Sequence, residues 1–317
     1  MLRPMPDEMS HTALQHAARQ EFVSAQHRVL DRYGVDAGSR YVDTPVLDGP
    51  AHVLTAGKGP PVVMVIGGGM VNALWAPLMA HLTGRTLYAV ELPGHGLTGP
   101  VRYDKETMRS TAMSFLTQVM DGLHVDNASF IGQSIGGLWS TWMALDAPER
   151  VSTISYVSCP AAALGSSAPL PLRVSTIRRV RALINTIDPP SRQQVQRMGR
   201  MNGEDLSDMP EVSDLFLAYQ RIPGCLDTLL DLHRAVVRVR GARPEVELTA
   251  EQLSRLRQPV QMIWGDRDPY GSPEIGEQMA LAIGHGSVHV FPGGHGVWFK
   301  QAEAIGPVIN DFLDRID

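Results

Sequence analysis

Residues 128–146 read ASFIGQSIGGLWSTWMALD. The apolar run at the start of this stretch predicts a buried strand, and the apolar residues after Ser134 predict a buried helix. The turn between them, Gly132-Gln133-Ser134-Ile135-Gly136, matches the Gly-x-Ser-x-Gly pattern of a sharp strand-to-helix turn. Such a turn strains the backbone of the serine, and only small residues on both sides let the chain pass so closely. The stretch therefore predicts a serine hydroxyl at the carboxyl edge of a sheet, where open α/β sheets bind ligands.

Short β-branched runs alternate with helical stretches along most of the chain, and this alternation predicts a doubly wound α/β sheet. Several of the runs are apolar throughout, as expected for strands buried on both faces. The expected strands are Ala51–Ala56, Val62–Ile66, Thr86–Val90, Ser129–Ile131, Thr153–Ser158, Val260–Trp264 and Val288–Phe291, with one more inside Arg40–Leu47. An amphipathic helix is expected at Glu8–Tyr33, outside the sheet, either docked on it or forming a contact between two copies of the chain.

About a hundred residues between Pro160 and Pro259 interrupt this rhythm, although a crossover helix needs only a dozen or so. They contain helical patches separated by Pro and Gly, so we expect an inserted helical cap. The patches are Arg173–Ile187, Val212–Arg221 and Leu226–Arg238. The cap's arginines concentrate between 173 and 200 and its acids between 204 and 231. Pairing between these helices explains this segregation, and steering of an anionic substrate is the sharper alternative.

The chain is thus expected to divide into an N-terminal helical extension, a core in two parts, and the cap. The boundaries are 1–37 for the extension, 38–159 and 259–317 for the core, and 160–258 for the cap.

The composition is that of a globular protein: 317 residues, 44% hydrophobic and 19% charged. A net charge of -5 gives no reason to expect binding to nucleic acid. The segment Met1–Ser10 lacks the apolar region of a secretory signal, and no apolar run is long enough to span a membrane. The two cysteines, Cys159 and Cys225, read as free thiols, so a cytoplasmic protein is expected.

A serine hydroxyl becomes a good nucleophile only when a base removes its proton and an acid orients that base. After the cap, an apolar strand runs into Gly265-Asp266-Arg267-Asp268-Pro269, which offers Asp268 as the acid and Asp266 as the reserve. The next strand ends at Pro292-Gly293-Gly294-His295-Gly296, a glycine-flanked loop that offers His295 as the base. The chain order of serine, acid and histidine matches that of a known hydrolase fold.

These motifs together resemble the α/β-hydrolase fold superfamily, in its serine hydrolase branch with a helical cap. The resemblance runs from about Arg40 to the end of the chain and rests also on Ile66-Gly67-Gly68-Gly69 and Pro93-Gly94-His95-Gly96. It implies a mostly parallel, eight-stranded, doubly wound sheet. It also favours Asp268 over Asp266, because in this family the triad acid is usually the aspartate of Gly-x-x-Asp before a proline.

The oxyanion hole should consist of two backbone N–H groups, the first from Ile135, directly after the nucleophile. The resemblance implies that Gly68 or Gly69 supplies the second. The sequence departs from the family in carrying Ile66 where a loop-bracing histidine normally stands, which leaves the exact donor open. Glu91 replaces the usual aspartate ahead of the Pro93 motif, and His95 is expected to be structural.

Trp75 and Trp298 lie next to the oxyanion loop and His295 in sequence, so we expect them either to line the substrate pocket or to pack. A dinucleotide site at Gly67–Gly69 is disfavoured, because Asn72 occupies the position of the third glycine in the Gly-x-Gly-x-x-Gly fingerprint. A metal site at His285 and His289 is also disfavoured, and no metal or organic cofactor is implied.

The leading hypothesis is a serine hydrolase that cleaves a small to medium carboxylic ester or lactone through an acyl-enzyme. A carbon–carbon bond hydrolase resembling the meta-cleavage-product hydrolases is the runner-up, and a non-catalytic ligand receptor on the same fold is the third possibility. All three imply a small-molecule partner.

Overall fold

The computed structural model describes residues 11–316. Expectations that fall on Met1–Ser10, namely the lack of a secretory signal and the start of the first helix at Glu8, lie outside the described residues. Within 11–316, no helix is both long enough and apolar enough to cross a membrane.

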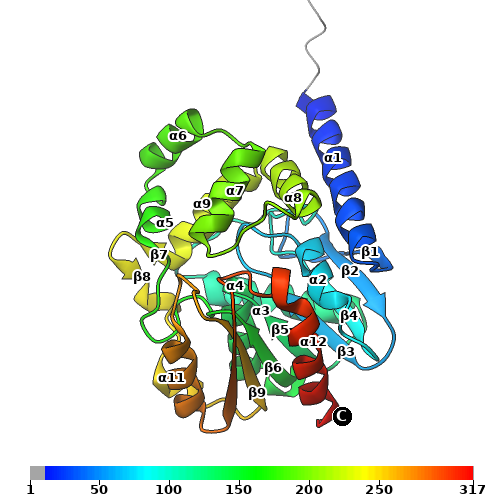
Figure 1. The fold of residues 1–317 in the computed structure, drawn as a ribbon, viewed down its shortest axis with the longest axis vertical. Helices are drawn as coiled ribbons and strands as arrows, with labels where there is room; N and C mark the ends of the chain where they lie inside the picture. The colour runs from blue at the N-terminus through cyan, green and yellow to red at the C-terminus, as the bar shows by residue number, and fades with distance from the viewer. Residues whose placement is uncertain (1–10, 317) are drawn as a thin grey trace, which may run out of the picture.

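An eight-stranded sheet forms the centre of the molecule (Figure 1), as predicted. Its strands are β1 (Ala37–Val42), β2 (Ala51–Gly57), β3 (Pro61–Val65), β4 (Thr86–Val90), β5 (Ala128–Gly132), β6 (Val151–Val157), β9 (Val260–Gly265) and β10 (Gly286–Phe291). They lie in the order β1-β2-β4-β3-β5-β6-β9-β10, and β2 runs antiparallel to both of its neighbours while all other pairs are parallel. The parallel strands therefore bring their carboxyl ends to one edge, which is where the predicted site residues follow them.

The first strand lies earlier than expected, at 37–42 rather than inside Arg40–Leu47. The reason is a turn: the backbone N–H of Leu47 donates to the carbonyl of Thr44, which ends the strand and leads back into β2. The hairpin pairs Ala37 with Ala56 and Val42 with Ala51.

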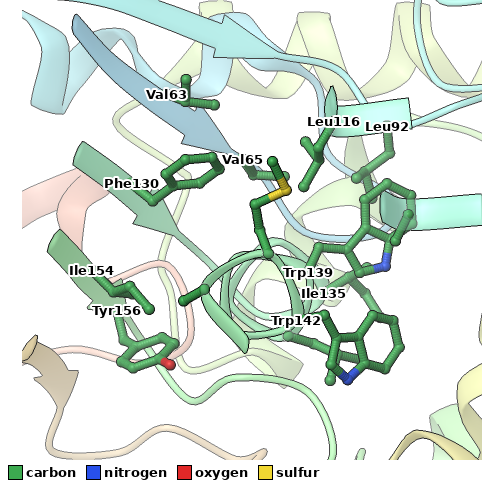
Figure 2. Close-up of a cluster of buried hydrophobic side chains, with 14 of the residues drawn as sticks. Val63, Val65, Leu92, Leu116, Phe130, Ile135, Trp139, Trp142, Ile154 and Tyr156 are labelled. Carbon is green, nitrogen blue, oxygen red and sulfur yellow. The ribbon is translucent and has the colours of Figure 1, made fainter. Parts of the chain in front are cut away.

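The strands are buried on both faces because their side chains alternate between two apolar layers. Val63, Val65 and Phe130 enter one layer, which is covered by α3 (Met108–Gly122), α4 (Ile135–Asp146), α10 (Ala250–Leu253) and α11 (Pro273–Ile283). Val62, Met64 and Ile131 enter the other, which is covered by α1 (His11–Arg32), η1 (Asn72–Trp75), α2 (Ala76–Met79) and α12 (Trp298–Asp314). Figure 2 shows Phe130 and Val65 facing helix α4, which carries Trp139 and Trp142.

Helices α5 to α9, here called the cap helices, gather beyond one end of the sheet (Figure 1). They are α5 (Leu170–Ser175), α6 (Arg178–Ile187), α7 (Arg192–Met201), α8 (Pro210–Arg221) and α9 (Cys225–Val236). The expected helix at Arg173–Ile187 is two helices, because Ile177 between them adopts an extended conformation. Helix α7 was not predicted, and neither was the short hairpin of β7 (Val237–Arg238) and β8 (Gly241–Ala242).

Residues 244–258, which fall within the expected cap, share an apolar layer with helices that cover the sheet. Val246, Leu248, Leu253 and Leu256 are buried in the same apolar layer as helix α4. The last of the cap helices, α9, ends at Val236.

Helix α1 docks against the cap helix α8 rather than against the strands alone. Phe22, Ala25 and Val29 are fully buried, and they belong to the apolar layer that also holds residues of α8. Two ion pairs join the same helices at their surface, Arg32 with Glu211 at 2.6 Å and Arg221 with Glu21 at 2.7 Å. The extension thus contacts the core and the cap together.

Candidate active site

Ser134 occupies the predicted turn between β5 and α4. Its φ of 53° and ψ of -114° are strained for a non-glycine residue, as the sequence predicts. Gly136 allows the turn, because a Cβ at that position would lie only 1.9 Å from the carbonyl oxygen of Val65. The turn holds the serine at the carboxyl edge of the sheet, directly before the N-terminus of α4.

Asp268 and His295 form a close buried pair. His295 Nδ1 lies 2.9 Å and 3.0 Å from the two carboxylate oxygens of Asp268. The backbone N–H groups of Cys159 and Tyr270 donate to the same carboxylate at 3.0 Å and 2.9 Å. This arrangement fixes the carboxylate and places the Nδ1 proton toward it, which leaves Nε2 of His295 as the nitrogen with no hydrogen-bond partner among the described residues.

Asp266, the reserve for the acid, has a different place. Its side chain accepts a hydrogen bond from the backbone N–H of Gly293 at 2.9 Å and lies beside Arg267 at the surface. Asp266 therefore braces the loop that carries His295, and Asp268 is the carboxylate that meets the imidazole.

A segment between α7 and α8 holds the histidine loop, residues 292–296. The carboxylate of Glu204 accepts hydrogen bonds from the backbone N–H groups of Gly294 at 2.6 Å and Gly296 at 3.2 Å. The backbone N–H of His295 donates to the carbonyl of Asn202 at 2.8 Å. Burial raises the pKa of Glu204, although the two N–H donors act in the opposite direction. The loop and the segment touch at Gly294, where a Cβ would lie 2.1 Å from the oxygen of Asn202.

Two further side chains fix His295. The amide of Gln133, the neighbour of Ser134, donates to the carbonyl of His295 at 3.2 Å, which ties the turn to the histidine loop. The ring of Tyr270 stacks on the imidazole with centroids 3.9 Å apart. The imidazole is therefore constrained by backbone, by stacking and by Asp268.

A cavity of about 380 Å³ opens between this edge and the cap helices. Ser134, Ile135, Gly68 and Gly69 line its floor together with His295. The opposite wall comes from α6, α7, α8 and α9. Its volume falls in the range of sites for small organic ligands.

The oxyanion loop, residues 67–70, runs beside the turn: a Cβ on Gly67 would lie 2.9 Å from Cβ of Ser134. The backbone N–H of Gly69 donates to His95 Nε2 at 3.1 Å. Among the residues described, the N–H groups of Gly68 and Ile135 have no hydrogen-bond partner. Gly68 is therefore better placed than Gly69 to donate to an oxyanion, together with Ile135 at the start of α4.

His95 is the brace of this loop. Its Nδ1 lies 3.0 Å from the carbonyl of Pro93, so Nδ1 carries the proton and Nε2 accepts from Gly69. The ring is fully buried and stacks on Tyr219 of α8 with centroids 5.7 Å apart. Burial lowers the pKa of His95 to about 4, so the imidazole is neutral at neutral pH.

Glu91 holds the loop that carries His95. Its buried carboxylate accepts from the backbone N–H of Leu97 at 2.9 Å and lies 3.1 Å from His52 Nδ1. A Cβ on Gly96 would lie 2.3 Å from the carboxylate, so a residue with a side chain there would displace it. The longer glutamate thus fills the space under this turn.

Comparison with known proteins decides the family. A family model described as "Alpha/beta hydrolase family" matches residues 62–306. The chain belongs to the alpha/beta hydrolase family. Among residues 11–316 of this hydrolase, no group of His, Cys, Asp and Glu side chains is placed to hold a metal ion.

Its relatives include enzymes named as esterases and enzymes named as hydrolases of 2-hydroxy-6-oxo acids. A pimeloyl-[acyl-carrier protein] methyl ester esterase of Shewanella sp. (strain MR-7) is 28% identical over 282 residues, covering 86% of this chain and 98% of the relative. A 2-hydroxy-6-oxononadienedioate/2-hydroxy-6-oxononatrienedioate hydrolase of Pseudomonas sp. is 25% identical over 293 residues, covering 88% and 98%. The crystal structure of carboxylesterase CesB (YbfK) from Bacillus subtilis has the same fold, with a TM-score of 0.73, 20% identity and 94% and 98% coverage.

Trp75 and Trp298 do not line the cavity of this hydrolase, which corrects their assignment to substrate binding. Both are fully buried and pack against each other with ring centroids 4.8 Å apart. The indole N–H of Trp298 donates to the carbonyl of Leu74 at 2.8 Å. The two tryptophans join α12 to η1 below the oxyanion loop, so proximity in sequence to the site did not mean exposure to it.

Several residues of the site were missed at the sequence level. They are Gln133, Arg181, Asn202, Glu204, His233 and Tyr270. Gln133 and Tyr270 carried a signal, since Gln133 directly precedes Ser134 and Tyr270 follows Asp268 by two residues. The others come from the cap helices and their connections, whose position over the sheet no local pattern reveals.

Proposed function

We propose that this α/β hydrolase is a serine esterase that cleaves a small to medium carboxylic ester or lactone. The observation that carries the proposal is the buried pair of His295 and Asp268: Nε2 of the imidazole has no partner among residues 11–316 and lies at a cavity that Ser134 also lines. A nucleophile, an oriented base and a small-molecule cavity are the parts that acyl transfer needs.

In the first half of the proposed reaction, Ser134 Oγ attacks the ester carbonyl carbon while Nε2 of His295 takes the hydroxyl proton. Asp268 stabilises the imidazolium that forms, without taking the proton itself. The tetrahedral intermediate collapses, the C–O bond to the alcohol breaks, and His295 returns the proton to the leaving oxygen.

In the second half, water attacks the acyl-Ser134 carbonyl and gives its proton to His295. The acid leaves and the serine recovers its proton. In both halves the negative charge on the carbonyl oxygen is met by the N–H groups of Ile135 and Gly68. Gly69, by contrast, has its N–H engaged with His95.

The relatives support an ester substrate, since one is named a methyl ester esterase. Carbon–carbon bond hydrolysis is the second candidate, because another relative of similar coverage is named a 2-hydroxy-6-oxononadienedioate/2-hydroxy-6-oxononatrienedioate hydrolase. The same serine, histidine and oxyanion donors would serve that reaction.

Multiple-turnover hydrolysis of p-nitrophenyl esters from acetate to decanoate tests the proposal. We expect turnover that Ser134→Ala and His295→Ala each abolish while circular dichroism remains that of the native protein. The chain length of the best ester measures the depth of the cavity. Turnover retained by Ser134→Ala would refute the assignment of Ser134 as the nucleophile. Turnover of a 2-hydroxy-6-oxo dienoate without that of any ester would favour the second candidate, and stoichiometric binding without turnover would indicate a receptor.

A further inference from the structure

The cap helices concentrate arginines, and ion pairs neutralise several of them. Arg178 pairs with Asp231 at 2.9 Å, Arg192 with Asp214 at 2.6 Å, and Arg197 with Asp188. These pairs lie at the surface, and they account for part of the segregation of charge seen in the sequence.

Arg181 differs from these arginines. It projects from α6 into the lining of the cavity, and its Nε is buried with no hydrogen-bond partner in the described part of the chain. No carboxylate among residues 11–316 forms an ion pair with it. Arg181 is partly buried, and a guanidinium is charged at any physiological pH, so burying part of it without an anion carries a desolvation cost. This cost is offset when an anionic ligand enters the cavity.

His233 lies on the same wall. It comes from α9, lines the cavity, and its Nδ1 is buried without a partner among the described residues. Burial lowers its pKa to about 3, with the positive charge of Arg181 acting in the same direction, so the ring is neutral. Its Nε2 would lie 3.7 Å from a Cβ on Gly68, so His233 faces the oxyanion loop.

The acids of the cavity wall are already engaged. Asp188 is paired with Arg197, and the carboxylate of Glu204 accepts the N–H groups of Gly294 and Gly296. Among the described residues of this wall, therefore, no free carboxylate balances the charge of Arg181.

We propose that Arg181 and His233 form a subsite for a carboxylate group of the substrate. The inference rests on the proposed function and narrows it: the substrate is an ester whose acyl or alcohol part also carries a free carboxylate. A carboxylate fits because its two oxygens match the planar fork of a guanidinium, and the imidazole N–H can donate to a third lone pair.

The test compares matched substrates at pH 7.5. The anionic series is the mono-p-nitrophenyl esters of succinate, adipate and suberate, and the neutral series is the p-nitrophenyl esters of butyrate, hexanoate and octanoate. We expect kcat/KM to favour the anionic ester of one chain length, and Arg181→Gln to reduce the anionic-to-neutral ratio roughly 10- to 100-fold. Arg181→Lys should retain part of the preference.

Arg178→Gln is the matched control, because Arg178 lies on the same helix, is exposed and is paired with Asp231. It should leave the ratio at the native value. Equal efficiency on both series, or a ratio that Arg181→Gln does not change, would overturn the carboxylate subsite while the esterase stands.

A binding measurement separates failure of the subsite from failure of the esterase. Ser134→Ala is titrated calorimetrically with monomethyl adipate and with methyl hexanoate, with and without Arg181→Gln. If Arg181→Gln weakens the binding of monomethyl adipate but not that of methyl hexanoate, the subsite is supported even if no ester is turned over. Equal binding with and without Arg181→Gln refutes it.

Discussion

The backbone N–H of His295 donates to the carbonyl oxygen of Asn202 at 2.8 Å, which ties the proposed base to the segment between α7 and α8. Glu204, two residues further on, accepts from both glycines that flank the histidine. A loop of the catalytic core is thus held by a segment inserted between two of its strands. The position of the segment between α7 and α8 and the position of His295 therefore depend on each other.

Glu204→Ala should lower kcat about tenfold with a smaller change in KM, because two N–H groups of the histidine loop lose their acceptor. Glu204→Gln should retain most of kcat, since its amide oxygen can accept both hydrogen bonds. The measurement is steady-state ester hydrolysis, with Glu303→Ala on the exposed face of α12 as control. Equal kcat for Glu204→Ala and the native protein would contradict this dependence.

The two aspartates of the loop after β9 should differ sharply. Asp268→Asn should reduce kcat roughly 10³- to 10⁴-fold, because an amide cannot stabilise the imidazolium and favours the wrong tautomer. Asp266→Asn affects the hydrogen bond with the backbone N–H of Gly293 at the surface, so it should reduce kcat less than about tenfold. Both variants are assayed with the same ester. A larger loss in Asp266→Asn would reverse the assignment.

Stability should fall on acidification partly through His95. Its pKa is lowered from 6.5 to about 4 by burial, so the unfolded chain binds a proton that the native one does not. This stabilisation is present above pH 6.5 and is lost as the pH falls toward 4, by up to about 1.4 kcal/mol per pH unit.

His95→Gln should therefore show a flatter pH dependence of the free energy of unfolding between pH 4.5 and 6.5. Urea unfolding measures it, with His27→Gln on the exposed face of α1 as control. Identical slopes for the native protein and His95→Gln would contradict the neutral, buried imidazole.

Gly136→Ala should destabilise the fold by about 3 kcal/mol, since the added Cβ would meet the Val65 carbonyl oxygen at 1.9 Å. Gly38→Ala in β1 is the matched control, because no atom of the described part of the chain lies within 4 Å of the added Cβ. It should be neutral or stabilising by up to about 1 kcal/mol. Thermal unfolding compares the two, and equal losses would show that the turn tolerates a side chain.

The sheet was predictable because its signals are local. Apolar runs such as Val62–Ile66 give strands buried on both faces, and the glycines around Ser134 give the turn. The same locality explains the error at β1, where a turn at Thr44 decides the boundary and apolar content does not. A cytoplasmic location and a homodimer stay predictions.

The positions of site residues were predictable only where the residue comes directly after a strand that the sequence also predicts. Asp268 and His295 meet because β9 and β10 are neighbours and run parallel. Arg181 lies on a cap helix and Glu204 in a connection between two of them, and their placement depends on packing over the whole cap, so no spacing in the sequence relates them to the sheet edge. Trp75 and Trp298 show the converse error, since residues beside a site in sequence can point into the core.

Helix α1 is fastened to α8 by two ion pairs and to the core by Phe22. This half of the cap therefore cannot swing away as a hinged lid without breaking both attachments. Helix α6 is held less firmly: Arg178 pairs with Asp231 of α9 at the surface, but none of the residues of α6 is fully buried, and Leu183 and Ile187 are largely exposed. Substrate should accordingly enter the cavity, and product leave it, beside α6, while α8 keeps its position.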